Sequence, residues 1–167
     1  FALNPWFLDK NELVEANYIH GSHAEDLELE NKNKNYFDFN SANFLTKKLG
    51  ELLYNAWESQ SEDRKNKFYQ WTKKNSWIED YSLFMVIREE FNMLPWWQWP
   101  LEFKQKNIDF LNKWVKTNNK SILITKLIQW HLDRQWNDIR EFARSYGIKL
   151  IGDLPFYVSR DSVDVWS

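Results

Sequence analysis

The C-terminal part of the chain, from residue 122 onward, restricts the possible folds more than any other part. Apolar side chains recur there at helical spacing up to residue 146: Ile128, Leu132, Ile139, Phe142 and Tyr146. Gly147 follows, as expected just past a helix C-terminus, and residues 148–151 resemble a short strand that is apolar on both faces. A helix, a glycine and a buried strand form half of a βαβ unit, so the sequence predicts an α/β fold.

Carboxylates and aromatic residues follow this predicted strand. The turn Asp153-Leu154-Pro155 comes first, and then Asp161 and Asp164 with Trp166 beside them. A sugar-processing α/β barrel places such groups around its substrate at the carboxyl ends of its strands. Asp153 is therefore a candidate to bind a sugar hydroxyl or to hold an arginine, and it equally suits a turn cap. Asp161 suits a helix N-cap as well, and Trp166 suits either a stacking platform or a core.

The rest of the chain is predicted to be mostly helical. Residues 1–8 are expected to be extended, and Asp9 to cap a first helix, with Glu12 at the capping-box spacing. The apolar spacing predicts helices at 10–19, 41–59, 62–75, 78–91, 102–116 and 122–146. The charged stretch 21–34 and the stretch 92–100 are predicted loops, and in the second loop two prolines bracket Trp96, Trp97 and Trp99.

Composition excludes several classes of protein. The net charge of −2 argues against a nucleic-acid partner, because phosphate binding needs a clustered positive excess. No apolar run approaches the roughly 20 residues of a membrane span, so no membrane partner is expected. The absence of cysteine removes disulfides and thiolate zinc sites and fits a reducing compartment.

No complete catalytic constellation stands in the sequence. Retaining glycosyl transfer needs two carboxyl groups about 5 Å apart, and with only one predicted barrel strand no such pair is identified. A Gly-rich phosphate loop and a G-x-S-x-G elbow are both missing from the sequence. His20, His23 and His131 are scattered, and a structural hydrogen bond is expected for His131. Asp161 and Asp164 lack a third ligand for a metal.

The segment 151–166 closely resembles a motif of the 4-α-glucanotransferases of glycoside hydrolase family 77. It reads I-G-D-L-P-F-Y-V-S-R-D-S-V-D-V-W, and the family pattern is I-G-D-L-P-I-Y-V-x-x-D-S-A-D-V-W. Four further resemblances occur in family order. Residues 1–5 are similar to F-A-G-N-P with Leu3 in place of glycine, and 77–88 to W-x-x-D-Y-A-L-F-x-A-L-K. Trp96, Trp99 and Pro100 resemble W-x-x-W-P, and 129–136 resemble Q-x-x-x-x-R-Q-W.

This resemblance implies a fragment of a (β/α)8 TIM barrel. Residues 1–120 would be a helical insertion, and residues 121–167 would supply a barrel helix, the third barrel strand and the following active-site loop. It also implies cleavage of an α-1,4-glucan through a covalent glucosyl-enzyme and transfer to another maltooligosaccharide, with no cofactor because a carboxylate is the nucleophile.

The resemblance also assigns residue roles. Asp153, Tyr157, Asp161 and Trp166 are the predicted substrate-binding residues, with Asp153 beside the reacting sugar. No catalytic residue is expected in this chain, because the family's nucleophile and acid/base come from later strands. We therefore expect the chain to be an internal piece of a larger enzyme, inactive alone, with an unpaired hydrophobic strand edge exposed in the isolated chain.

Two alternatives compete with this interpretation. Another hydrolase of the α-amylase clan would carry Asn-His where Tyr157-Val158 stand, which disfavours it. A free-standing helical glucan-binding or interaction module would use the tryptophans of the 92–100 loop.

Overall fold

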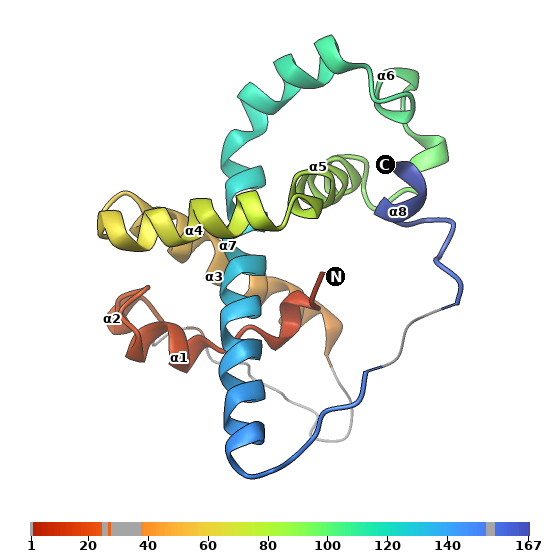
Figure 1. Cartoon of the computed structure of the whole chain (residues 1–167). Coiled ribbons are helices and arrows are strands. Elements are labelled where there is room, and N and C mark those ends of the chain that lie inside the picture. Colours follow the sequence, from red (N-terminus) through yellow and green to blue (C-terminus); the bar gives the residue numbers. More distant parts are fainter. Residues whose placement is uncertain (1, 25–26, 28–37, 153–155) are drawn as a thin grey trace.

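The computed structural model describes residues 2–24, 27, 38–152 and 156–167, and in these ranges the regular structure is helical (Figure 1). The elements are the 3₁₀-helices η1 (Pro5–Phe7) and η2 (Trp96–Gln98) and the α-helices α1 (Lys10–Glu15), α2 (Gly21–Ala24), α3 (Phe39–Trp57), α4 (Glu62–Lys74), α5 (Trp77–Glu90), α6 (Leu101–Lys104), α7 (Ile108–Ser145) and α8 (Val163–Trp166). The predicted helices at 41–59, 62–75 and 78–91 are confirmed to within two residues at each end. The first predicted helix is shorter than expected, and η1 replaces part of the extended N-terminal segment.

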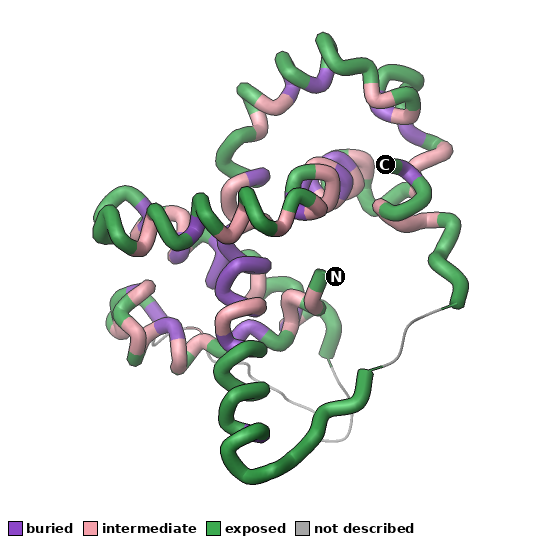
Figure 2. Tube along the Cα trace, viewed as in Figure 1, coloured by how far each residue is buried: buried purple, intermediate pink, exposed green. Residues whose placement is uncertain are grey.

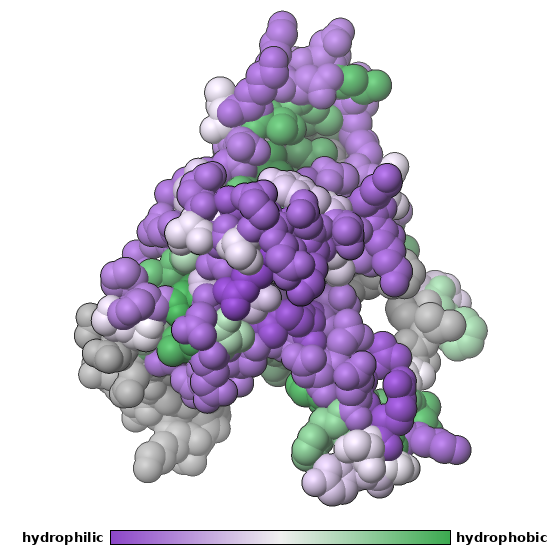
Figure 3. Space-filling model, turned by 60° about the vertical axis from the view of Figure 1, so that its left-hand side comes forward, coloured by the Kyte–Doolittle hydropathy of each residue, from purple (hydrophilic) through white to green (hydrophobic). Residues whose placement is uncertain are grey.

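Helix α7 is the axis of the structure. Helices α3, α4, α5 and α6 all pack against it, as does η1 (Figure 1). Its middle is buried, whereas its last turns extend beyond the other helices and are exposed (Figure 2). Most of the face shown in Figure 3 is hydrophilic, with smaller apolar patches near the top, at the left and at the lower end of the view.

The sequence predicted two helices where α7 is one. The polar stretch 117–121 looked like a break, yet it contains neither glycine nor proline and stays helical. The Thr117 hydroxyl and the Asn118 amide both donate to the backbone oxygen of Trp114, at 2.8 and 3.1 Å. Such back-bonding bends helices, and α7 curves in its N-terminal half (Figure 1). The real break falls earlier, at Lys106 with φ 49°, after which Asn107 caps α7.

The predicted strand at residues 148–151 is not formed in the structure of this chain, whose described residues contain no strand. Gly147 does end α7 as expected, with φ 71°. The Gly147 and Ile148 N–H groups donate to the oxygens of Arg144 and Ala143, which is the Schellman pattern. Beyond it Ile151 is 96% exposed. A strand exists only through hydrogen bonds to a neighbouring strand, and none lies beside this segment in the described part of the chain.

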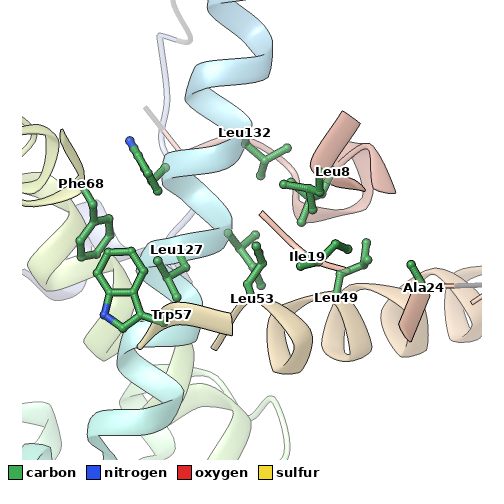
Figure 4. Close-up of a cluster of buried hydrophobic side chains, with 12 residues drawn as sticks. Leu8, Ile19, Ala24, Leu49, Leu53, Trp57, Phe68, Leu127 and Leu132 are labelled. Carbon is green, nitrogen blue, oxygen red and sulfur yellow. The ribbon is translucent and has the colours of Figure 1, made fainter. Parts of the chain in front are cut away.

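A hydrophobic core fills the space between α7, α3, α4 and the N-terminal segment (Figure 4). The rings of Trp57 of α3 and Trp130 of α7 meet the ring of Phe68 edge-on, with their centroids 4.9 and 5.5 Å from the Phe68 centroid. These edge-on contacts are the favoured geometry for aromatic pairs. Helix α3 approaches α7 closely at Gly50, because a methyl group there would lie 2.6 Å from Cγ2 of Ile124.

Two buried glutamines of α7 hold the N-terminal segment. The side chain of Gln129 accepts the Leu3 N–H and donates to the Leu3 oxygen, at 2.9 and 2.8 Å. Gln135 does the same with the backbone of Asp9, at 3.0 and 3.1 Å. Each amide thus pairs with one residue as a neighbouring strand would, which satisfies polar groups that burial would otherwise leave without partners.

An ion pair completes this attachment. Both Nη atoms of Arg134 bind the carboxylate of Glu12, each at 2.5 Å. Burial raises the pKa of Glu12, but hydrogen bonds from Arg134 and Gln135 and the charge of Arg134 outweigh it and keep the pKa below its ordinary value. Glu12 therefore stays charged, and from its predicted place in the first turn of α1 it attaches this helix to Arg134 and Gln135 of α7.

The close approach at Gly50 gives a first prediction. Gly50→Ala should lower the free energy of unfolding by about 1–2 kcal/mol, because overpacking costs more than the roughly 1 kcal/mol of helix propensity gained. Urea denaturation measures the change. Gly152→Ala is the matched control, since a methyl group there meets nothing within 4 Å. Equal stability of Gly50→Ala and wild type would contradict tight α3–α7 packing.

His131 gives a second prediction. Burial, with the nearby charges of Arg134 and Arg64, lowers its pKa from 6.5 to about 3. Between these values the unfolded state binds the proton and the folded state does not, so stability should fall as the pH drops below 6.5, by up to about 1.4 kcal/mol per unit. Urea denaturation at pH 7 and pH 5 should show this loss, and His131→Gln should reduce it. A His131 ring that titrates near 6.5 by NMR would overturn the argument.

Candidate functional site

An open pocket of about 630 Å³ lies between α5 and the C-terminal segment with α8. It is lined by Ala2, Ser76, Trp77, Asp80, Tyr81, Phe84, Met85, Arg88, Asp161, Ser162, Val163, Asp164 and Ser167. Three stretches that resemble the family motifs therefore meet here, although they are far apart in the sequence. This pocket is the candidate functional site.

Helix α5 forms one wall. Trp77, Tyr81, Phe84 and Arg88 follow one another at four, three and four residues, which places them on one face of the helix. The indole of Trp77 and the ring of Tyr81 meet edge-on with centroids 5.9 Å apart. Burial raises the pKa of Tyr81 to about 12, so its phenol is neutral and can donate a hydrogen bond. This wall combines aromatic faces with a few polar groups, as ligand sites commonly do.

The C-terminal segment forms the opposite wall, and Asp161 fixes it. One carboxylate oxygen of Asp161 accepts from Nη2 of Arg88 at 2.8 Å, and the other accepts the Trp96 N–H at 3.2 Å. The neighbouring Arg160 is also held, because its backbone oxygen accepts from Nε1 of Trp96 at 2.8 Å and its guanidinium lies over the ring of Trp97. Ser162 precedes α8 as its N-cap residue, but its side chain makes no capping bond.

Trp166 lies beneath this wall, in a second hydrophobic core that includes Phe84, Trp99 and Phe103. Its side chain is 4% exposed and packs against the rings of Phe84 and Trp99, with centroids 5.7 and 5.8 Å away. Its indole N–H donates to the backbone oxygen of Phe103 at 3.0 Å. Of the two possibilities for Trp166, the core position is the one the structure shows.

Three carboxylates line the pocket, those of Asp80, Asp161 and Asp164, and the first two are engaged in ion pairs within the described part of the chain. Asp80 forms an ion pair with Lys106 at 2.7 Å, and Lys106 also lies over the ring of Trp166. Asp161 forms the pair with Arg88, so neither carboxylate is free to act as a nucleophile. Within the described ranges, no cluster of three metal-ligating side chains occurs. The arrangement suits binding and orientation rather than bond cleavage.

The four sequence-predicted site residues lie in different places. Asp153 lies outside the described residues. Tyr157 is 91% exposed and is not part of the pocket wall. Asp161 lines the pocket, and Trp166 supports it from the core. Their predicted contact with substrate stays a prediction.

The sequence reasoning missed the α5 wall as a site. The sequence pattern identifies this stretch only as a family-like helix, which contains Trp77, Asp80, Tyr81 and Arg88. Their spacing on one helical face was a usable signal, but the surface that would meet this face could not be known. The tryptophan-rich loop was overvalued as a binding surface: Trp99 is buried, Trp96 binds the C-terminal segment, and Trp97 lies under Arg160.

Comparisons with known proteins agree with this arrangement. The chain matches the family described as 4-alpha-glucanotransferase over residues 1–167. A 4-alpha-glucanotransferase of Clostridium butyricum is 31% identical, with 100% of this chain and 34% of that protein covered. A chloroplastic/amyloplastic 4-alpha-glucanotransferase of Solanum tuberosum is 32% identical over 74% of this chain and 21% of its own length.

The fold also has a solved counterpart. The structure of amylomaltase from Streptococcus agalactiae in complex with acarbose matches with a TM-score of 0.89 and 22% identity, over 99% of this chain and 33% of that one. The chain thus has the fold of the corresponding part of an amylomaltase. Together with the match over its whole length, this shows that it belongs to the 4-alpha-glucanotransferase family, glycoside hydrolase family 77. The chain spans about a third of the length of the Clostridium butyricum relative.

No described helix combines the length and the apolar character needed to cross a membrane.

The burial of Trp166 gives a third prediction. Trp166→Ala should lower the free energy of unfolding by about 3–5 kcal/mol, because it removes a buried ring and opens a cavity. Trp166→Phe should cost less, since an aromatic ring remains in the core and only part of the buried indole and its N–H bond to the Phe103 oxygen are lost. The control is Trp136→Phe, at a position 40% exposed. A loss no larger for Trp166→Ala than for the control, in urea denaturation, would contradict the core role.

Proposed function

We propose that the complete protein is a 4-α-glucanotransferase that transfers α-1,4-glucan chains between maltooligosaccharides. The family match over residues 1–167 is the observation that carries this proposal. The reaction would be a retaining double displacement, in which a carboxylate attacks the glucan, a covalent glucosyl-enzyme forms, and an acceptor sugar takes the glucosyl group in place of water.

The catalytic pair is assigned to the part of the relatives' length that this chain does not match. Double displacement needs a free carboxylate nucleophile and a protonated acid, about 5 Å apart. Asp80 and Asp161, which line the pocket, are each held in an ion pair. We therefore assign them to shape and binding, and no cofactor takes part in the proposed mechanism.

Asp153, Tyr157 and Asp161 are the proposed substrate-side residues of this chain, with Trp166 supporting the wall from below. Asp153 would hydrogen-bond the reacting sugar, and the exposed phenol of Tyr157 would offer a face and a hydroxyl to the glucan. In the complete protein, residues 1–120 would form a helical insertion and 121–167 would complete one unit of a (β/α)8 barrel, with 148–151 as a strand once neighbouring strands pair with it.

The proposed compartment is the cytoplasm or the plastid stroma, since the relatives include a bacterial protein and one named chloroplastic/amyloplastic. The alternative of a free-standing glucan-binding module is not favoured, because Trp96, Trp97 and Trp99 are engaged within the chain.

A fourth prediction tests the proposed function in the complete protein with maltotriose as the only substrate. Wild type should yield glucose together with maltooligosaccharides longer than maltotriose, separated by chromatography. Asp153→Ala should lower kcat/KM by roughly 10²-fold or more, because it removes a group beside the reacting sugar.

The matched control is Asp63→Ala, which removes an exposed carboxylate of α4 that does not line the pocket. Wild-type products limited to glucose and maltose would indicate hydrolysis and overturn the transferase proposal. A fully active Asp153→Ala would leave the family intact and return Asp153 to a structural role.

A further inference from the structure

The C-terminal segment is attached to the helices at only a few described points. After α7 ends, Phe156 and Tyr157 remain almost fully exposed. In the described part of the chain, attachment begins at Arg160 and Asp161 and is completed by Trp166 in the core. Among the described residues of the segment, Asp161 is the first whose side chain meets an opposite charge.

The partner, Arg88, is well placed to hold this segment. It lies in the last turn of α5, at the end of the helix face that forms the pocket wall. Its side chain is 26% exposed and that of Asp161 is 19% exposed, so water screens the pair only in part. Since Asp161 also accepts the Trp96 N–H, the carboxylate is fixed from two directions.

Among the described residues, Asp161 is the one hydrogen-bond partner of the Arg88 guanidinium. Nε of Arg88 is buried without a hydrogen-bond partner among the described residues, and the ring of Phe84 lies 5.9 Å away. The hydrogen bond from Nη2 to Asp161 therefore sets the direction of the group. Lysine would keep the charge but not the planar geometry that aims it.

We propose that Arg88 is a positioning residue for glucan binding. Through Asp161 it fixes the residues from Arg160 onward, and thereby the position of Tyr157, which lies four residues upstream. Arg88 touches no sugar in this proposal. The inference rests on the proposed function for its consequence, but the attachment itself is independent of it.

The test uses the complete protein and compares Arg88→Met, Arg88→Lys and the double variant Arg88→Asp with Asp161→Arg. Arg88→Met should raise the KM for maltotriose about 10-fold, because the binding-competent position of the segment becomes a minor population. The value of kcat should change less than about 3-fold, since the reacting groups are untouched once substrate is bound. Arg88→Lys should recover part of the KM, and the exchanged pair should recover part of what Arg88→Asp alone loses.

The control is Glu89→Gln, which breaks the exposed ion pair between Glu89 and Lys47 one position along α5. It should leave KM unchanged. If Arg88 were merely structural, Arg88→Met and Arg88→Lys would lower thermal stability alike, and KM would not change separately from kcat.

Hydrogen exchange of the peptide covering 156–167 provides a readout without activity. Arg88→Met should speed its exchange at least 10-fold relative to wild type, whereas Glu89→Gln should not. Unchanged exchange and unchanged KM in Arg88→Met would overturn the proposal. If Arg88→Met does not fold, Asp161→Asn, which keeps size and removes charge, decides by the hydrogen exchange of the same peptide, because Asp161 is itself a proposed substrate-side residue and its KM does not isolate the attachment. If wild type makes no transfer products, the proposed function fails, and faster exchange would still support the attachment.

Discussion

Burial of the middle of α7 is the constraint on which the rest of the structure depends. Leu127, Ile128, Trp130 and Leu132 are buried there, and so are Gln129, His131 and Gln135. Apolar side chains at these positions need cover on every side, and the polar ones need hydrogen-bond partners as well. Helices α3 and α4 provide cover on one side and α5 on another, while the N-terminal segment supplies the backbone groups that satisfy the two glutamines.

The family-like stretches of the chain contact one another in pairs. The N-terminal stretch meets the stretch around Gln129 through the amide bonds to Leu3. The α5 stretch and the tryptophan-rich loop both meet the last stretch, through Arg88 and Trp96 bound to Asp161. These residues therefore bind segments to one another across the fold. The resemblance of these stretches to the family motifs, in the same order along the chain, is explained as much by assembly of the fold as by contact with substrate.

The ion-paired carboxylates near the pocket have a structural role. A carboxylate that is ion-paired and hydrogen-bonded on both oxygens holds a wall in place and does not attack a substrate. Asp161 meets this description, and Asp80 is paired with Lys106. Under the proposed function, this chain would supply shape, aromatic surface and position, and free carboxylates elsewhere in the complete protein would supply the chemistry.

The sequence by itself determined most of the helices. Helical spacing marked α3, α4 and α5, Asp9 marked the start of α1, and Gly147 marked the end of α7, because these signals depend on local backbone geometry and capping. The strand expected at 148–151 could not be decided locally, since it requires a partner strand, and the continuity of α7 through its polar stretch was missed because side-chain back-bonds replaced the expected break. Only the tertiary structure joined Arg88 to Asp161, 73 residues away, and buried Trp166 instead of exposing it. Such contacts depend on how separate helix faces pack together, which no local pattern of residues specifies.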